Sequence, residues 1–76
     1  MTPLLLTIEE NSPTLEAAQA FIGGYVQMAT LENGDQLLVD EEGLLKQLAY
    51  NLPASILAGQ HLVGNVICLK GSARWT

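Results

Sequence analysis

The dipeptide Asn33-Gly34 constrains this chain more than any other short segment, because it lies between two apolar runs. Asparagine and glycine tolerate the positive φ angles that the two central positions of a tight hairpin turn require. The flanking residues, 25–31 and 36–39, have the composition of strands. The sequence therefore predicts an antiparallel hairpin over these residues, with both Asn33 and Gly34 at positive φ.

A first helix is expected before this hairpin. Ser12-Pro13 is typical of a helix start, since serine caps free backbone N–H groups and proline fits the first helical position. Apolar residues then recur at helical spacing from Leu15 to Ile22. Gly23-Gly24 favours an end at that point, because glycine readily takes the left-handed conformation that closes many helices.

A second helix is predicted over residues 44–50, because Asp40-Glu41-Glu42 supplies a cap and two carboxylates to its positive end. Asn51-Leu52-Pro53 interrupts this helix, and residues 53–58 are expected to form another short helical turn closed by Gly59. The buried stripe of the longer helix is expected to consist of four apolar residues: Leu44, Leu45, Leu48 and Ala49.

Two apolar runs outside the hairpin complete the set of strands. Residues 4–8 precede the first helix, and residues 62–69 form the last strand, with a bend at Gly64-Asn65. The order β-α-β-β-α-(α)-β indicates an α+β fold, with a small, largely antiparallel sheet and two or three short helices. We expect one domain over residues 1–76, with residues 70–76 as a candidate C-terminal arm.

The size of the chain predicts self-association. A domain of 76 residues buries only about 60% of the surface that its unfolded chain exposes. Disulfides or a structural metal usually compensate, but the chain has one cysteine, Cys68, and one histidine, His61. Charged residues make up 14% of the chain and apolar residues 49%, which leaves too little polar surface to coat a monomer. We therefore expect a homo-oligomer, as a dimer or a larger closed ring.

Charge is sorted by position along the chain. All eight acidic residues lie at or before Glu42, and the three basic residues, Lys46, Lys70 and Arg74, lie after it. This division predicts two unlike faces, of which the C-terminal one attracts an anionic ligand. The net charge of -5 argues against direct binding of DNA or RNA, whose affinity depends on neutralising phosphates.

Two features indicate the compartment. A lone cysteine within the apolar run 66–69 is typical of a small buried side chain in a reducing environment. Residues 1–6 lack the cationic start of a signal peptide, so we expect a cytoplasmic protein without a membrane segment.

The segment 70–75 combines two cations, a hydroxyl and the only indole of the chain, without an acidic residue. An arginine can fork onto phosphate and an aromatic ring can stack on a base. Lys70, Arg74 and Trp75 therefore indicate a site for an anionic, nucleotide-like ligand. The alternative is a frayed chain end whose charges only aid solubility.

Three residues elsewhere are candidates for the same ligand. Tyr25 and Tyr50 have apolar rings with polar tips, which belong either to the edge of the core or to a pocket. Asn51 is expected either to close the preceding helix or to read a base edge in a cleft between subunits.

Catalysis and metal binding have less support in the sequence. Asp40-Glu41-Glu42 offers oxygen ligands for a hard cation, but adjacent residues point in different directions and the spacing is not that of a calcium loop. His61 is the only ordinary general base, and no nucleophile or acid stands at a suggestive spacing. We expect no enzyme, no cofactor and no metal, with a weak metal-dependent hydrolase as the remaining alternative.

Several short motifs follow one another between roughly residues 22 and 67: Gly23-Gly24-Tyr25-Val26, Asn33-Gly34, Val39-Asp40-Glu41-Glu42-Gly43, Asn51 with Ala54, and Gly64-Asn65-Val66. In this order they resemble a family of short uncharacterised proteins from phages and bacteria. Residues 47–50 depart from that family's shorter approach to the asparagine. The resemblance implies a phage or mobile-element origin, and it brings no catalytic residue.

Two hypotheses about function result. The first is a non-enzymatic homo-oligomer that captures a nucleotide-like host signalling molecule between subunits and so counters antiviral defence in the host cytoplasm. The second is an acidic inhibitor of a host protein, in which Asp40, Glu41 and Glu42 imitate nucleic acid or cover a basic surface. The low total charge and the basic, aromatic C-terminal segment favour the first.

Overall fold

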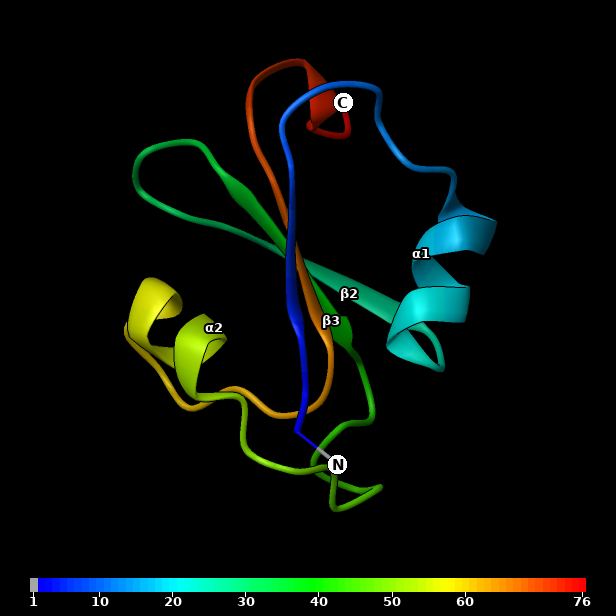
Figure 1. Ribbon diagram of the computed structural model, residues 1–76, viewed down its shortest axis with the longest axis vertical. Helices are drawn as coiled ribbons and strands as arrows, with labels where there is room; N and C mark the ends of the chain where they lie inside the picture. Colours follow the sequence, from blue (N-terminus) through cyan, green and yellow to red (C-terminus); the bar gives the residue numbers. More distant parts are fainter. Residues whose placement is uncertain (1) are drawn as a thin grey trace.

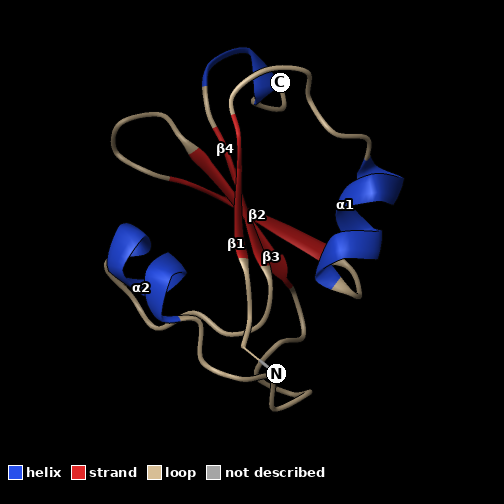
Figure 2. Cartoon of the chain, viewed as in Figure 1, coloured by secondary structure: helices blue, strands red, loops and turns tan. Residues whose placement is uncertain are grey.

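A four-stranded mixed sheet lies between two helices in the computed structural model, which describes residues 2–76 (Figure 1). The order β-α-β-β-α-β confirms the predicted α+β fold (Figure 2). Within residues 2–76, no helix is long and apolar enough to cross a membrane. The elements are β1 (Leu5–Ile8), α1 (Leu15–Ile22), β2 (Val26–Thr30), β3 (Gln36–Asp40), α2 (Leu52–Ala58), β4 (Val66–Leu69) and a 3-10 turn, η1 (Gly71–Ala73).

The strands lie in the spatial order β1-β4-β3-β2, so β1 and β2 form the two edges of the sheet. β3 pairs antiparallel with both β2 and β4, whereas β1 runs parallel to β4. The sheet is therefore largely antiparallel, as predicted. Its one parallel pair joins the first and last strands, with Leu5 opposite Val66.

Side chains of the sheet alternate between two small cores, one under each helix. Both central strands are almost fully buried, because α1 covers one face of the sheet and α2 the other. Cys68 is a small buried side chain of the core, as its position in an apolar run predicted. Burial raises the pKa of its thiol. The buried residues are Ala18, Ile22, Leu38, Ile67, Leu69 and Ala73 on the α1 face, and Leu37, Ala54, Val66 and Cys68 on the α2 face.

The predicted hairpin is present, but its turn differs from the expected one. A hydrogen bond from the Leu31 N–H to the Asp35 carbonyl (2.7 Å) closes a loop of three residues. Within this loop only Gly34 has a positive φ, of 93°. Asn33 instead accepts the Asp35 N–H with its side-chain oxygen (3.0 Å). The asparagine therefore stabilises a longer loop, and the expectation of two positive-φ residues is wrong.

α1 has the bounds that its apolar spacing predicted, and Gly23 ends it in the left-handed conformation (φ 90°). The predicted cap at Ser12 is wrong, because the Thr14 hydroxyl accepts the Ala17 N–H (3.1 Å) and so caps the helix. Ser12 instead donates to the Ala73 carbonyl (2.8 Å). Its hydroxyl therefore ties the segment before α1 to η1.

Residues 41–47 form successive turns where the sequence predicted a helix over residues 44–50. Gln47 has a left-handed backbone (φ 56°), which interrupts helical repetition. Tyr50 then pairs with Val63 in an isolated antiparallel bridge, so the residues before α2 are extended. The expected buried stripe is also wrong, because Leu44 and Leu45 are 75% and 83% exposed.

The short helix predicted over residues 53–58 is α2, and Gly59 closes it as expected (φ 71°). Asn51 caps the start of α2, because its side-chain oxygen accepts the Ala54 N–H (3.1 Å). Asn51 therefore opens α2 and does not close a preceding helix.

The same asparagine is only 1% exposed and joins three segments of the chain. Its amide nitrogen donates to the carbonyls of Leu4 (3.1 Å) and Gly64 (2.8 Å). Together with the cap, these bonds use both N–H groups and the oxygen of the Asn51 side chain inside the fold. A ligand that bound this amide would have to displace those bonds.

We expect Asn51→Ala to lower the free energy of unfolding by about 2–4 kcal/mol, because it removes a cap and one hydrogen bond to each of two carbonyls. The Leu4 carbonyl keeps its bond from the Val66 N–H, whereas the Gly64 carbonyl loses its side-chain donor. Asn51→Asp keeps the cap acceptor but sets a carboxylate against both carbonyls, so it should destabilise at least as much. Thr14→Ala, which removes only the exposed cap of α1, should cost about 1 kcal/mol. Urea denaturation followed by circular dichroism measures all three. Equal losses for Asn51→Ala and Thr14→Ala would contradict the joining role of Asn51.

Candidate functional site

The six residues that the sequence indicated for a ligand lie in three separate places. Lys70, Arg74 and Trp75 follow β4, Tyr25 lies between α1 and β2, and Tyr50 with Asn51 precedes α2. Folding therefore does not gather them into one site within a single chain.

Lys70 forms a salt bridge with Asp35 at the start of β3. This hydrogen-bonded contact lowers the pKa of the Asp35 carboxyl, and it raises the pKa of Lys70. The ammonium group is thus already balanced by a carboxylate of its own chain. A phosphate that approached Lys70 would compete with Asp35 for it.

Arg74 and Trp75 fasten the C-terminal segment to the rest of the fold. The Arg74 guanidinium donates to the carbonyls of Gly34 (3.2 Å) and Gly71 (3.1 Å). The indole N–H of Trp75 donates to the Pro13 carbonyl (3.0 Å), and its ring packs against the α1-face core. These bonds hold the segment between the hairpin loop and the chain before α1.

Tyr50 stacks on His61, with ring centroids 4.7 Å apart and an angle of 28° between the ring planes. Both residues are exposed, and they lie just before and just after α2. His61 is therefore a surface residue between α2 and the last strand. Each ring covers one face of the other, so the Tyr50 ring is only partly free to stack on a ligand.

Both lysines are neutralised by acids from the first half of the chain. Lys46 binds Asp40, with 2.8 Å between Nζ and Oδ2, just as Lys70 binds Asp35. The charge sorting along the sequence therefore does not become a basic face opposed to an acidic one. Six exposed acids form no salt bridge within residues 2–76: Glu9, Glu10, Glu16, Glu32, Glu41 and Glu42.

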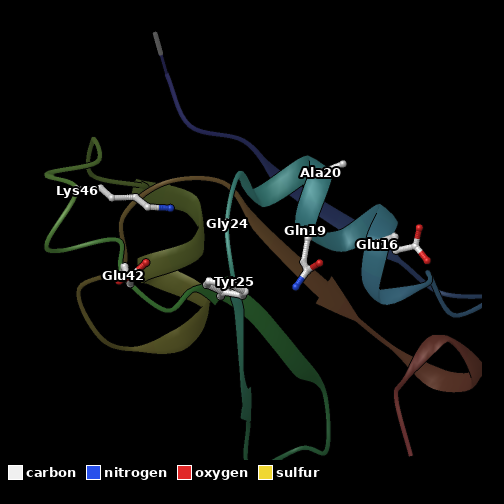
Figure 3. Close-up of a pocket in the computed structure, with 7 residues that line it drawn as sticks. All are labelled: Glu16, Gln19, Ala20, Gly24, Tyr25, Glu42 and Lys46. Carbon is white, nitrogen blue, oxygen red and sulfur yellow. The ribbon is translucent and has the colours of Figure 1, made fainter.

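A groove of about 480 Å³ opens between α1 and the turns at residues 41–47 (Figure 3). Tyr25 lies in it between Glu42 and Gln19, and Glu16 stands further along α1. The tyrosine is 68% exposed, so its ring is available to a ligand. The lining residues are Glu16, Gln19, Ala20, Gly24, Tyr25, Glu42 and Lys46.

Lys46 is fixed at this groove by contacts on several sides. Its Nζ donates to the Gly23 carbonyl (3.3 Å) as well as to Asp40, and it lies where a side chain on Gly24 would begin. The Asp40 side chain is 1% exposed, and its other oxygen accepts the Glu42 N–H (2.8 Å). Asp40 therefore holds a turn and an ammonium group, and it does not cap a helix as predicted.

The charges at the groove favour a positively charged ligand. Glu16 and Glu42 contribute two carboxylates to its lining, while Lys46 is balanced by Asp40. An exposed tyrosine ring beside carboxylates can bind a guanidinium or ammonium group through a cation–π contact and an ion pair. Within residues 2–76 no cluster of three or more side chains has the geometry to hold a metal ion.

Among the residues of this groove, the sequence indicated Tyr25 as a ligand residue and Glu42 as part of an acidic docking surface. Helical spacing shows which side of α1 is buried, but it does not show what the exposed side adjoins, so Glu16 and Gln19 were missed. Gly24 is the feature of the sequence that pointed to this groove. Gly23 alone ends α1, so a second glycine at this position requires another explanation. Its role is close packing against Lys46.

A family model described as a domain of unknown function (DUF3846) matches residues 2–75, nearly the whole chain. Comparison with curated proteins and comparison with solved structures each give no significant match.

Lys46→Met should lower the free energy of unfolding by about 1–3 kcal/mol, because it leaves the buried Asp40 carboxylate without its cation. Adding Asp40→Asn should recover part of this loss, since the amide still accepts the Glu42 N–H but carries no charge. Gly24→Ala should also destabilise, because its new methyl group displaces the ammonium. Urea denaturation measures each variant. A double variant no more stable than Lys46→Met would show that the ion pair is not the cause.

The salt bridge between Asp35 and Lys70 should make stability depend on pH at both extremes. The folded pKa of Asp35 is lowered, so its contribution is present above the ordinary value of 3.8 and is lost as the pH falls through the folded pKa. The folded pKa of Lys70 is raised, so its contribution is present below 10.5 and is lost as the pH rises through the folded pKa. The difference in melting temperature between the wild type and Asp35→Asn should therefore shrink below pH 3.8. A constant difference down to pH 2 would refute this linkage.

Proposed function

We propose that this protein, which belongs to the family described as a domain of unknown function (DUF3846), is a non-enzymatic binding protein. In this proposal its acidic surface docks on a basic partner protein. The observation that supports this function is the neutralisation of both lysines by carboxylates of the same chain. It leaves exposed glutamates as the dominant surface charge. Such a surface attracts positively charged partners and repels anionic ones.

The Tyr25 groove provides an anchoring point on this surface. An arginine or lysine side chain of the partner fits against the Tyr25 ring, with its charge toward Glu42. The Glu16 carboxylate points away from Tyr25 beyond Gln19, and it adds negative charge further along α1. Interfaces often depend on a few such contacts between a cation and an aromatic residue. In this mechanism the glutamates speed the encounter, and the groove fixes the orientation of the partner.

Capture of a nucleotide-like molecule is the alternative function. One observation favours it, since a groove of about 480 Å³ is within the range that small ligands occupy and contains Tyr25. The other indicated residues are already engaged: Lys70 with Asp35, Arg74 with backbone carbonyls, and Asn51 inside the fold. An anionic ligand would have to displace those contacts, so we place this function second.

A phage or mobile-element origin, and action in the cytoplasm of a host cell, belong to the same proposal. They rest on the motif resemblance described in the sequence analysis. In that setting the partner is a host protein with a basic surface, and the acidic chain occupies the place of nucleic acid on it.

A hexa-arginine peptide is a suitable probe for this function, because it carries only the proposed chemistry. We expect its affinity, measured by isothermal titration calorimetry, to fall with added salt. Tyr25→Ala should weaken binding about tenfold through loss of the cation–π contact, and Tyr25→Phe should keep it. Glu16→Gln with Glu42→Gln should weaken binding further, whereas Glu9→Gln with Glu10→Gln removes the same two charges outside the groove and serves as the matched control. Equal affinity for Tyr25→Ala and the wild type would refute the groove, and tighter binding of a nucleotide than of the peptide would favour the alternative function.

A further inference from the structure

β2 is an edge strand without the features that usually protect an edge. Among residues 2–76, β2 pairs with β3 on one side and with no strand on the other. Its sequence, Val26–Thr30, contains no charged residue and no proline. Proteins commonly blunt such edges with charge, proline or a bulge, because free N–H and C=O groups recruit another strand. β1, the other edge, leads directly into two acids, Glu9 and Glu10.

The hydrogen bonds at the two ends of the hairpin identify the free groups on β2. The Glu41 N–H donates to the Tyr25 carbonyl (2.9 Å), and the Leu31 N–H donates to the Asp35 carbonyl (2.7 Å). The direction of the backbone N–H and C=O groups alternates along an antiparallel strand. In β2 these groups point toward β3 at the odd-numbered residues and away from β3 at the even-numbered ones. The residues whose backbone N–H and C=O groups point away from β3 are Val26, Met28 and Thr30.

We propose that β2 pairs with the same strand of a second copy, antiparallel about a two-fold axis at Met28. In this register Met28 lies opposite Met28 of the partner subunit, and Val26 lies opposite Thr30 of the partner subunit. Each outward N–H then meets a carbonyl, because hydrogen-bonded pairs of antiparallel strands exchange both bonds. One strand therefore supplies both halves of a self-complementary interface, and the two sheets become continuous.

The charges around β2 favour a second copy as the occupant of this edge. Two chains of net charge -5 repel each other in general, but β2 brings no carboxylates face to face. The same register carries the exposed Glu32 in the hairpin loop toward Gly24 of the partner subunit. Lys46 lies against that glycine and is paired with Asp40, so Glu32 of one copy approaches this ion pair of the other.

Exposure of Met28 points to the same surface. Met28 is 46% exposed although it lies opposite the fully buried Leu38 on the α1 face of the sheet. Pairing at β2 sets the two methionine side chains together, which removes apolar surface from water. This surface also accounts for part of the low share of charged residues, 14%, in so small a chain.

Crosslinking at position 28 tests the register. Hydrogen-bonded antiparallel residues have Cα atoms about 5.5 Å apart, which is within the span of a disulfide. Met28→Cys should therefore oxidise to a species of twice 8.2 kDa that a reducing agent converts back. Gln27→Cys is the matched control, because in this register residue 27 of one copy lies opposite residue 29 of the other. The two residues at position 27 are diagonal neighbours, about 7–8 Å apart, which is too far for a disulfide without backbone movement. Cys68 is buried, so the wild type gives the background.

Analytical ultracentrifugation tests the pairing itself. We expect the wild type to sediment as a dimer at high micromolar concentration, and Met28→Lys, which sets like charges opposite each other, as a monomer. Gln27→Lys carries the same charge on the other face of β2 and should remain a dimer. A monomeric wild type, or equal crosslinking at positions 27 and 28, would overturn the proposal. Titration of the arginine peptide into monomeric Met28→Lys tests the groove without the dimer. The proposed dimer and the proposed groove can therefore fail independently.

Discussion

The amide of Asn51 is the interaction on which the rest of this structure depends. Its nitrogen binds the carbonyls of Leu4, just before β1, and Gly64, just before β4, while its oxygen begins α2. Leu5 and Val66, which follow Leu4 and Gly64 by one and two positions, stand opposite each other in neighbouring strands, although they are far apart in the sequence. One buried side chain thus sets the register of the parallel pair and the position of α2. Only an amide offers donors and an acceptor in this arrangement.

Local signals were sufficient for the elements that local contacts specify. The spacing over residues 15–22 and the glycine after it predicted α1, and Asn33-Gly34 located the hairpin, because helix period and turn residues act over a few positions. Residues 44–50 also have helical spacing, yet they fold as turns and an extended segment. Partners outside this segment decide the difference, since Lys46 binds Asp40 and Tyr50 pairs with Val63. No pattern within the segment reports those partners.

The candidate site shows the same limit. Sequence position separates the acids from the bases, which predicts a division of the surface into an acidic and a basic part. In space β3 sets Asp35 beside Lys70, and the turns after β3 set Lys46 beside Asp40. A sequence gives the number of charges, but it does not tell which of them are already paired. Tyr25 was identified because exposed aromatic residues are informative by type, whereas Glu16 and Glu42 belong to the groove only through the placement of α1 beside the turns.

The parallel pairing of β1 with β4 has a consequence for synthesis of the protein. The ribosome makes β1 before α1, the hairpin and α2, and it makes β4 after them, so these elements emerge while β1 still has no strand to join. Bringing the two strands together closes a loop that contains most of the polypeptide, which is a slow and entropically costly step. During that interval the apolar residues of β1 are uncovered and accessible to chaperones and proteases.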